Sequence, residues 1–282
     1  MKKITALMLS SAMMLSLAAC GGSASTETVS SEAASSEAAS SEAVSTEEAA
    51  SADAAAVTTV NAGKLTMSTN AAFPPYEMTD DSGNVVGIDA EIAGAIADKL
   101  GLELVIDDMD FDAAQLAVQQ GKSDICMAGL SVTEDRLLVM DFSDSYATGI
   151  QVVIVPEGSD VTLDNLGEQL IGTQRATTGN IYCTDDYGED HVIAYDDGIV
   201  AVQDLLNGKV DAVVIDKAPA QEFVAANPGL VILDTEYANE DYAIGVAKGN
   251  TALVDAVNGA LAELTADGTI QSIIEKYIPA EG

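Results

Sequence analysis

The stretch SDICMAGLSVTEDRLLVMDFS, Ser123 to Ser143, decides how the chain folds. It begins with an apolar run, Ile125 to Met127, whose length suits a buried strand. The run breaks at AGLS, residues 128–131, and the polar segment that follows contains Arg136. In open α/β sheets ligands bind at the carboxyl ends of strands, and an arginine fork holds a carboxylate with two parallel hydrogen bonds. The stretch therefore predicts a carboxylate-binding site at the end of a buried strand.

The same residues also allow a purely structural interpretation. Thr133 can act as the N-cap of a short helix on which Arg136 points to water. The composition favours a binding role, because the chain has two arginines, Arg136 and Arg175, against nine lysines. Since surface charge is built mainly from other residue types, we expect Arg136 to have a specific function.

Strands and helices alternate along most of the chain, in two successive series. Asp89 and Asp197 are expected N-caps of helices, and Phe111 leads into another helix that ends at Gly121. Strands are predicted at 64–68, 102–106, 125–127, 149–155, 170–173, 192–194, 210–215 and 242–247, and helices at 90–100, 111–121, from 181 onward, 197–207, 217–226, 251–266 and 269–277. This alternation predicts a mostly parallel sheet covered by helices in each of two lobes.

The order of the elements also predicts how the two lobes are connected. We expect a first lobe made of residues 58–150 and 243–282, and a second lobe made of residues 151–242. The chain would leave the first lobe through 149–153 and return through 241–245. Two crossings beside one cleft form a hinge.

The N-terminal residues have a different composition from the rest of the chain. Two lysines, an apolar run and small residues before Cys20 predict a secretory signal peptide at residues 1–19. The sequence LAAC that ends at Cys20 resembles the lipobox of bacterial lipoproteins, in which the cysteine is lipidated. Near-copies of SSEAA within residues 20–57 predict a disordered tether. We therefore expect the protein on the extracytoplasmic face of the cell membrane, attached to the membrane only by its lipid.

Composition excludes several classes of function. The net charge of −35 excludes nucleic acid as a partner. Besides Cys20, the chain has Cys126 and Cys183, which we expect to be two separate buried thiols. With a single histidine and no cysteine cluster, we expect no metal and no cofactor. We also expect the protein to be a monomer.

Taken in order, the motifs resemble family 3 of the bacterial extracellular solute-binding proteins, the polar amino-acid receptors of ABC importers. The resemblance covers roughly residues 62–279 and depends on FPPY at 73–76, GIDAEI at 87–92, AGLSVT at 128–133 with Arg136, DFS at 141–143, GKVDA at 208–212, Asp216 and DGTI at 267–270. It implies a two-lobed, type II periplasmic-binding-protein-like fold with a two-strand hinge. It also implies a free amino acid as ligand, an ABC permease as partner and no enzymatic activity.

The resemblance further implies which residues hold the amino-acid backbone. Arg136 would bind the α-carboxylate, helped by the backbone N–H groups of Ser131 and Thr177. Asp216 would bind the α-ammonium, together with the Gly129 carbonyl and the Ser131 hydroxyl. Without the family, Asp216 could equally be the N-cap of the helix that follows it.

Five residues would surround the ligand side chain: Asn70, Phe73, Phe111, Ala128 and Gln174. Phe73 and Phe111 would sandwich it, although both could be ordinary core residues. Family members that take cationic side chains resemble one another in an Asp at the position of Asn70. An amide removes that charge, and Ala128 followed by glycine resembles the glutamine-binding members. The expected ligand is therefore a neutral polar, glutamine-like amino acid.

Two alternatives to this ligand and function stay open. Arg175, beside Thr177, could face an acidic side chain or point to water, so an acidic amino acid or cystine is the alternative ligand. A dehydratase on the same fold would need a second titratable group in the side-chain pocket. The polar and aromatic residues predicted there offer none.

Overall fold

The computed structural model describes residues 57–234 and 236–279. The predicted signal peptide, Cys20 and nearly all of the tether fall within residues 1–56, outside the described part of the chain. Among the described residues, no helix is long and apolar enough to cross a bilayer.

Within this part of the chain, nine strands form one sheet in the order β5-β1-β6-β12-β7-β10-β8-β9, with β11 paired to β7. The strands are β1 (Lys64–Thr69), β5 (Glu103–Asp108), β6 (Ile125–Cys126), β7 (Met140–Pro156), β8 (Ile171–Gln174), β9 (Val192–Tyr195), β10 (Ala212–Asp216), β11 (Leu230–Ile232) and β12 (Ala238–Ala247). At one end β5, β1 and β6 are parallel, and at the other β10, β8 and β9 are parallel. Two parallel series therefore form the two lobes, as predicted.

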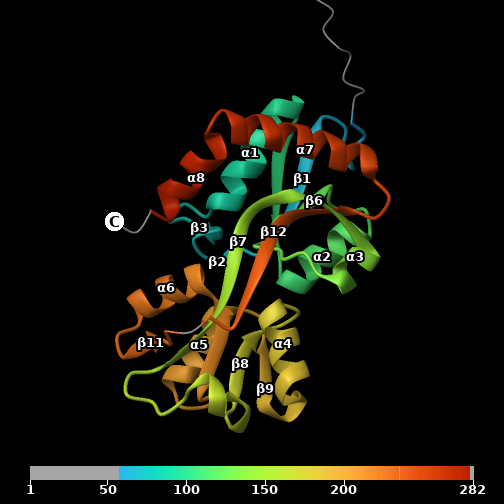
Figure 1. Ribbon diagram of the computed structural model, residues 1–282. Helices are drawn as coiled ribbons and strands as arrows, with labels where there is room; N and C mark the ends of the chain where they lie inside the picture. The colour runs from blue at the N-terminus through green and yellow to red at the C-terminus, as the bar shows by residue number, and fades with distance from the viewer. Residues whose placement is uncertain (1–56, 235, 280–282) are drawn as a thin grey trace, which may run out of the picture. The chain divides into compact units, whose positions relative to one another are not determined.

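The long antiparallel strands β7 and β12 run between the two lobes (Figure 1). Strand β7 has 17 residues, and its first part pairs with β12. Its last part pairs with β10 and β11 of the second lobe. The pairs Gly149–Glu240 and Thr148–Asp241 lie where the chain passes from one lobe to the other. The predicted two-strand connection is confirmed, while the exact lobe boundaries remain a prediction.

Helices cover the sheet at both ends (Figure 1). They are α1 (Ile88–Leu100), α2 (Phe111–Gln119), α3 (Glu134–Val139), α4 (Thr178–Tyr187), α5 (Gly198–Leu206), α6 (Lys217–Ala226), α7 (Thr251–Ala266) and α8 (Thr269–Tyr277), with 3-10 turns η1 (Leu163–Glu168) and η2 (Glu189–His191). Helices α1, α7 and α8 pack together over the first lobe, and α4, α5 and α6 pack on the second. The bounds of α6, α7 and α8 are those that the sequence pattern predicted.

A second, three-stranded sheet brings Phe73 and Glu77 to the cavity between the lobes. It contains β2 (Ala72–Phe73), β3 (Glu77–Thr79) and β4 (Val85–Val86), with β3 and β4 joined by a turn at 80–84. Gly87 packs against this sheet, and a Cβ there would lie 2.2 Å from the Tyr76 carbonyl oxygen. Only glycine fits so close to that carbonyl at this φ of 133°. The close contact fixes β3 against the start of α1.

Two predicted helix starts are wrong. The N-cap of α1 is Gly87, and Asp89 lies inside the helix with its side chain fully buried. Helix α4 begins at Thr178 rather than Ile181, because Thr177 caps it by accepting a hydrogen bond from the Asn180 N–H at 3.2 Å. The result is a helix N-terminus at the cavity, three residues before the predicted start of the helix.

Candidate ligand-binding site

All ten residues that the sequence singled out for binding line one cavity between the lobes, which we call the interlobe cavity. It contains about 300 Å³ of space outside the protein atoms, part of which is open to solvent. Its lining residues are Asn70, Phe73, Glu77, Phe111, Ala128, Gly129, Ser131, Arg136, Gln174, Thr177, Thr178 and Asp216. Glu77 and Thr178 are therefore additions that the sequence did not predict.

Arg136 lies at the cavity with only 6% of its surface exposed. Thr133 caps α3 by accepting a hydrogen bond from the Arg136 N–H at 3.2 Å, so the capping interpretation of this stretch is confirmed. The same interpretation placed the Arg136 side chain in water, and that part of it is wrong. The guanidinium donates to the Ser131 carbonyl at 2.8 Å and stacks over the Phe111 ring, 5.5 Å from its centroid.

The guanidinium also reaches the second lobe, where it donates to the Ala176 carbonyl at 2.9 Å. Ala176 has a φ of 61°, an unfavourable conformation for a residue with a Cβ. This backbone turn leads directly into Thr177 and the N-terminus of α4. A helix N-terminus and a buried guanidinium next to each other form a strong anion-binding environment.

Gly129 determines how closely Phe73 approaches the cavity. Its φ is 52°, and a Cβ at this position would lie 2.7 Å from Cε1 of Phe73. The Gly129 N–H donates to Asp89 Oδ2 at 2.9 Å, and the Tyr146 hydroxyl donates to Asp89 Oδ1 at 2.7 Å. The buried Asp89 therefore holds the AGLS turn in place instead of capping α1.

Asp216 ends β10, lines the cavity and is 7% exposed. It occupies the N-cap position of α6, but its side chain makes no capping hydrogen bond. It instead accepts hydrogen bonds from Gln151 Nε2 at 2.6 Å and from the Tyr242 hydroxyl. Burial raises the pKa of Asp216 to about 7, so that a nearby cation would favour its ionised form. The alternative of a simple helix cap is not what the geometry shows.

Asn70 connects the two lobes through its amide. Gln174 Nε2 donates to the Asn70 carbonyl oxygen at 2.8 Å, and Asn70 Nδ2 donates to Asp197 Oδ1 at 3.2 Å. Asp197 is at the N-cap position of α5, as predicted, but its side chain makes no capping bond. Sequence reasoning therefore missed that Asp197 brings a carboxylate next to Asn70.

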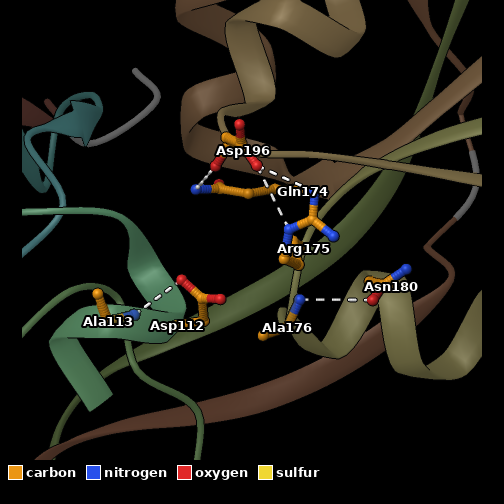
Figure 2. A network of polar contacts seen from close by, with 7 residues as sticks. All are labelled: Asp112, Ala113, Gln174, Arg175, Ala176, Asn180 and Asp196. Carbon is orange, nitrogen blue, oxygen red and sulfur yellow. Dashed lines mark hydrogen bonds and ion pairs between the residues drawn. The ribbon is translucent and has the colours of Figure 1, made fainter. Parts of the chain in front are cut away.

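Arg175 is not one of the residues that line the interlobe cavity, and its side chain lies next to Asp196 (Figure 2). Its Nη2 forms an ion pair with Asp196 Oδ1 at 3.0 Å, and both side chains are more than half exposed. Ala176, the next residue, donates its N–H to Asn180 Oδ1 at 3.4 Å. Of the two positions left open for Arg175, the structure has the one in solvent.

The two cysteines in the described part of the chain are not joined to each other. Cys126 and Cys183 are both buried and free, as predicted. Over residues 57–234 and 236–279, no group of three or more His, Cys, Asp or Glu side chains has the arrangement of a metal site.

The fold and the cavity define a class of protein: a two-lobed α/β protein with a largely polar cavity between its lobes. Residues 65–280 match the family model described as bacterial extracellular solute-binding proteins, family 3. The chain belongs to this family. Family 3 proteins bind solutes for ABC transporters outside the cytoplasm.

Curated and solved relatives agree with this assignment. A "Probable histidine-binding protein" of Neisseria gonorrhoeae is 32% identical, over 80% of this chain and 88% of the relative. The structure of an ancestral arginine-binding protein bound to glutamine is 38% identical, with a TM-score of 0.73 over 76% of this chain and 97% of that one. The arginine-, lysine-, histidine-binding protein ArtJ from Geobacillus stearothermophilus is 32% identical, with a TM-score of 0.74 over 78% and 96%.

Proposed function

We propose that this protein captures a free α-amino acid in the interlobe cavity outside the cytoplasm and delivers it to the permease of an ABC importer. The observation that carries the proposal is the placement of opposite charges. Arg136, the N-terminus of α4 and the Asp216 carboxylate all line the same cavity. A zwitterion presents the complementary pair of charges.

We assign the amino-acid backbone to the residues named from the sequence. Arg136 binds the α-carboxylate with the N–H groups of Ser131 and Thr177. Asp216 binds the α-ammonium with the Gly129 carbonyl and the Ser131 hydroxyl. That hydroxyl donates to Glu240 Oε2 at 3.0 Å, which leaves its lone pairs free for an ammonium.

The ligand side chain would lie between Phe73 and Phe111, with Asn70, Ala128 and Gln174 around its end. The glutamine-like ligand expected from the sequence rests on Asn70 and Ala128. The position of Arg175 in solvent argues against an acidic ligand, and cystine is retained as an alternative. Relatives described as histidine-, arginine- and L-cystine-binding support the choice of an amino acid without deciding which one.

Ligand binding would stabilise the closed arrangement of the lobes. Contacts that already join them, Gln174 to Asn70 and Arg136 to Ala176, lie at the rim and wall of the same cavity. A ligand held from both lobes binds the closed form more tightly than the open form. We propose that the permease recognises this closed form.

The remaining assignments concern the chain outside the cavity. We propose that residues 1–19 are removed, that Cys20 carries a lipid, and that residues 21–57 tether a monomer to the extracytoplasmic face of the membrane. Mass spectrometry of the protein extracted from membranes tests this, since an unmodified N-terminus would contradict it.

We propose that the protein does not act on its ligand chemically. The dehydratase alternative requires a titratable group in the side-chain pocket, and Glu77 is such a group, so it must be tested directly. Incubation of the protein with each amino acid, followed by mass spectrometry, should return the ligand unchanged. Formation of a dehydrated product would overturn this part of the proposal.

A thermal-unfolding panel tests the main proposal. The protein is unfolded and refolded to remove carried-over ligand, then heated with each of the twenty amino acids, ornithine and cystine. A ligand at 100 times its dissociation constant adds about 2.7 kcal/mol to the free energy of unfolding. At least one amino acid should raise the melting temperature. If none does, the amino-acid proposal is wrong.

A further inference from the structure

Glu240 is an acid that lies where the chain passes between the two lobes. It belongs to β12, and its Cα pairs with that of Gly149 on β7 at one of the crossing points. Its side chain is half-buried and is not part of the lining of the interlobe cavity. Any contribution of Glu240 to ligand binding must therefore pass through other residues.

The Glu240 carboxylate has hydrogen-bond partners from both lobes. Ser131, which follows β6 of the first lobe, donates its hydroxyl to Glu240 Oε2 at 3.0 Å. Gln151, which pairs with Asp216 of β10 in the second lobe, donates Nε2 to the same oxygen at 3.0 Å. Tyr182 of α4 is a third partner, since burial, followed by the Glu240 charge and a hydrogen bond to it, raises the pKa of the Tyr182 hydroxyl. One carboxylate therefore joins the two lobes beside the cavity.

The bond to Glu240 decides what the Ser131 hydroxyl can offer to a ligand. A hydroxyl has one proton to donate, and here that proton is directed at the carboxylate. Ser131 is 3% exposed and lines the cavity, so its oxygen faces a ligand as an acceptor only. An acceptor suits an ammonium group, which has donors alone, and does not suit a ligand atom that needs a proton from the protein.

Gln151 connects Glu240 to Asp216, the second group assigned to the α-ammonium. Gln151 Nε2 donates to Asp216 Oδ2 at 2.6 Å as well as to Glu240, so its two N–H bonds serve two carboxylates. Only the NH₂ end of the amide can face both acids, which fixes the direction of its oxygen. That oxygen lies against α4, where a Cβ at Gly179 would be 2.7 Å from it. Gly179 therefore leaves room for the orientation of Gln151 that holds Asp216.

The charge of Glu240 acts on both ends of the proposed backbone site. Burial lowers the pKa of Arg136, and the Glu240 charge is the largest influence in the opposite direction. Burial raises the pKa of Asp216, and among the charges around it that of Glu240 adds most to the increase. Glu240 thus partly balances the buried guanidinium and makes the region of the α-ammonium more negative.

We propose that Glu240 is a positioning residue that sets Ser131 Oγ and, through Gln151, Asp216 as acceptors for the α-ammonium, so that the site selects amino acids over α-hydroxy acids. The inference rests on the amino-acid function proposed above and deepens it. An α-hydroxy acid of the same side chain supplies one proton where the ammonium supplies three, and it carries no positive charge. In this site its hydroxyl oxygen would meet the Ser131 oxygen without a proton from the protein between them.

The test is titration calorimetry on the full-length protein in mild detergent. The probes are arginine, histidine and glutamine, each compared with the α-hydroxy acid that has the same side chain. The ratio of the two affinities within a pair cancels the side-chain contribution, so it reports recognition of the amine whichever side chain binds best. We expect the wild type to prefer the amino acid by about 1,000-fold or more.

Two variants of Glu240 separate its acceptor oxygens from its charge. Glu240→Met removes both and frees the Ser131 proton for a ligand oxygen, so the preference for the amino acid should fall by about 10- to 100-fold. Glu240→Gln keeps one oxygen that can accept from Ser131 and Gln151, and its preference should lie between those of Glu240→Met and the wild type. Asp241→Asn, an exposed acid one residue further along β12, is the matched control and should show the wild-type preference.

Melting of the ligand-free protein gives a check that does not depend on the ligand. Glu240→Met should lower the melting temperature less in a Ser131→Ala background than in the wild type, because the bond between the two residues is already absent there. Additive losses would mean that Glu240 does not hold Ser131, and would overturn the inference whatever the ligand is. If Glu240→Met does not fold, Glu240→Ala, which leaves room for water, replaces it in both experiments.

Other results would overturn the inference in distinguishable ways. Equal losses of affinity for the amino acid and the hydroxy acid in Glu240→Met would mean that Glu240 only supports the fold, and would leave the amino-acid function intact. A wild type that binds both members of a pair equally would reject selection by the α-ammonium. Absence of any shift with every amino acid in the thermal-unfolding panel would reject the proposed function together with the inference.

Discussion

Replacement of Arg136 by alanine is the most direct test of the proposed α-carboxylate site. The substitution removes a guanidinium that is 6% exposed and contacts Ser131, Phe111 and Ala176. In the complex, the ligand carboxylate would remain buried without its charged partner. Breaking such a pair costs about 3 to 5 kcal/mol, so affinity should fall by about 100- to 4,000-fold.

The structure also provides a matched control and a folding check. Arg175→Ala removes the other arginine of the chain, whose partner Asp196 is on the surface, and should change affinity little. Thr133 still caps α3 in Arg136→Ala, so the protein should fold, with roughly 1 to 2 kcal/mol lost from the two hydrogen bonds to carbonyls. Calorimetry measures the affinities and circular dichroism the fold. Near-normal ligand affinity in folded Arg136→Ala would refute the site.

Three further predictions follow from the site and the tether. The pKa of Asp216 is raised from 3.8 to about 7 in the folded protein, so the folded state holds more protons than the unfolded state between these values. The free energy of unfolding of the ligand-free protein should therefore fall as pH rises from about 4 to 7. Thermal melts over this pH range should show a smaller fall in Asp216→Asn than in the wild type. An equal fall in both proteins would contradict the prediction. Gly129→Ala places a Cβ 2.7 Å from Phe73 at a φ of 52°, so it should cost about 1 to 3 kcal/mol of stability and weaken binding. A melting temperature equal to that of the wild type would show that the turn can adjust. Deletion of residues 21–57 should leave affinity unchanged in calorimetry, because the tether has no proposed role in the cavity; a large loss would mean that it contacts the site.

Much of the fold could be predicted because it depends on local patterns. The bounds of α7 and α8 match the prediction, since apolar spacing and the turn at Asp267-Gly268 are local signals. The two series of strands and helices, and their connection through β7 and β12, followed from the same alternation. The placement of Arg136 in a cavity followed from the scarcity of arginine and from the break after a buried strand.

Helix starts were less predictable, because an N-cap depends on backbone geometry as well as on residue type. Asp89 has the side chain of a good cap, but Gly87 takes that position because its close contact with Tyr76 excludes a Cβ. Asp89 is consequently moved into the buried first turn of α1. Asp197 is at the cap position, yet its carboxylate turns to Asn70 from the other lobe.

The sequence by itself determined the alternating α/β architecture, the two-lobed connection and the residue types that suit an amino-acid backbone. Only the tertiary structure decided where the acids lie. Glu77 stands between Tyr76 and Met78 on a short strand, and nothing within a few residues indicates whether its side chain meets water or the cavity. Its burial depends on segments distant in sequence, since β3 packs against α1 and the groups near its carboxyl are Asp89, Cys126 and Asp216. The environment of a side chain is set by such long-range contacts and not by its neighbours in sequence.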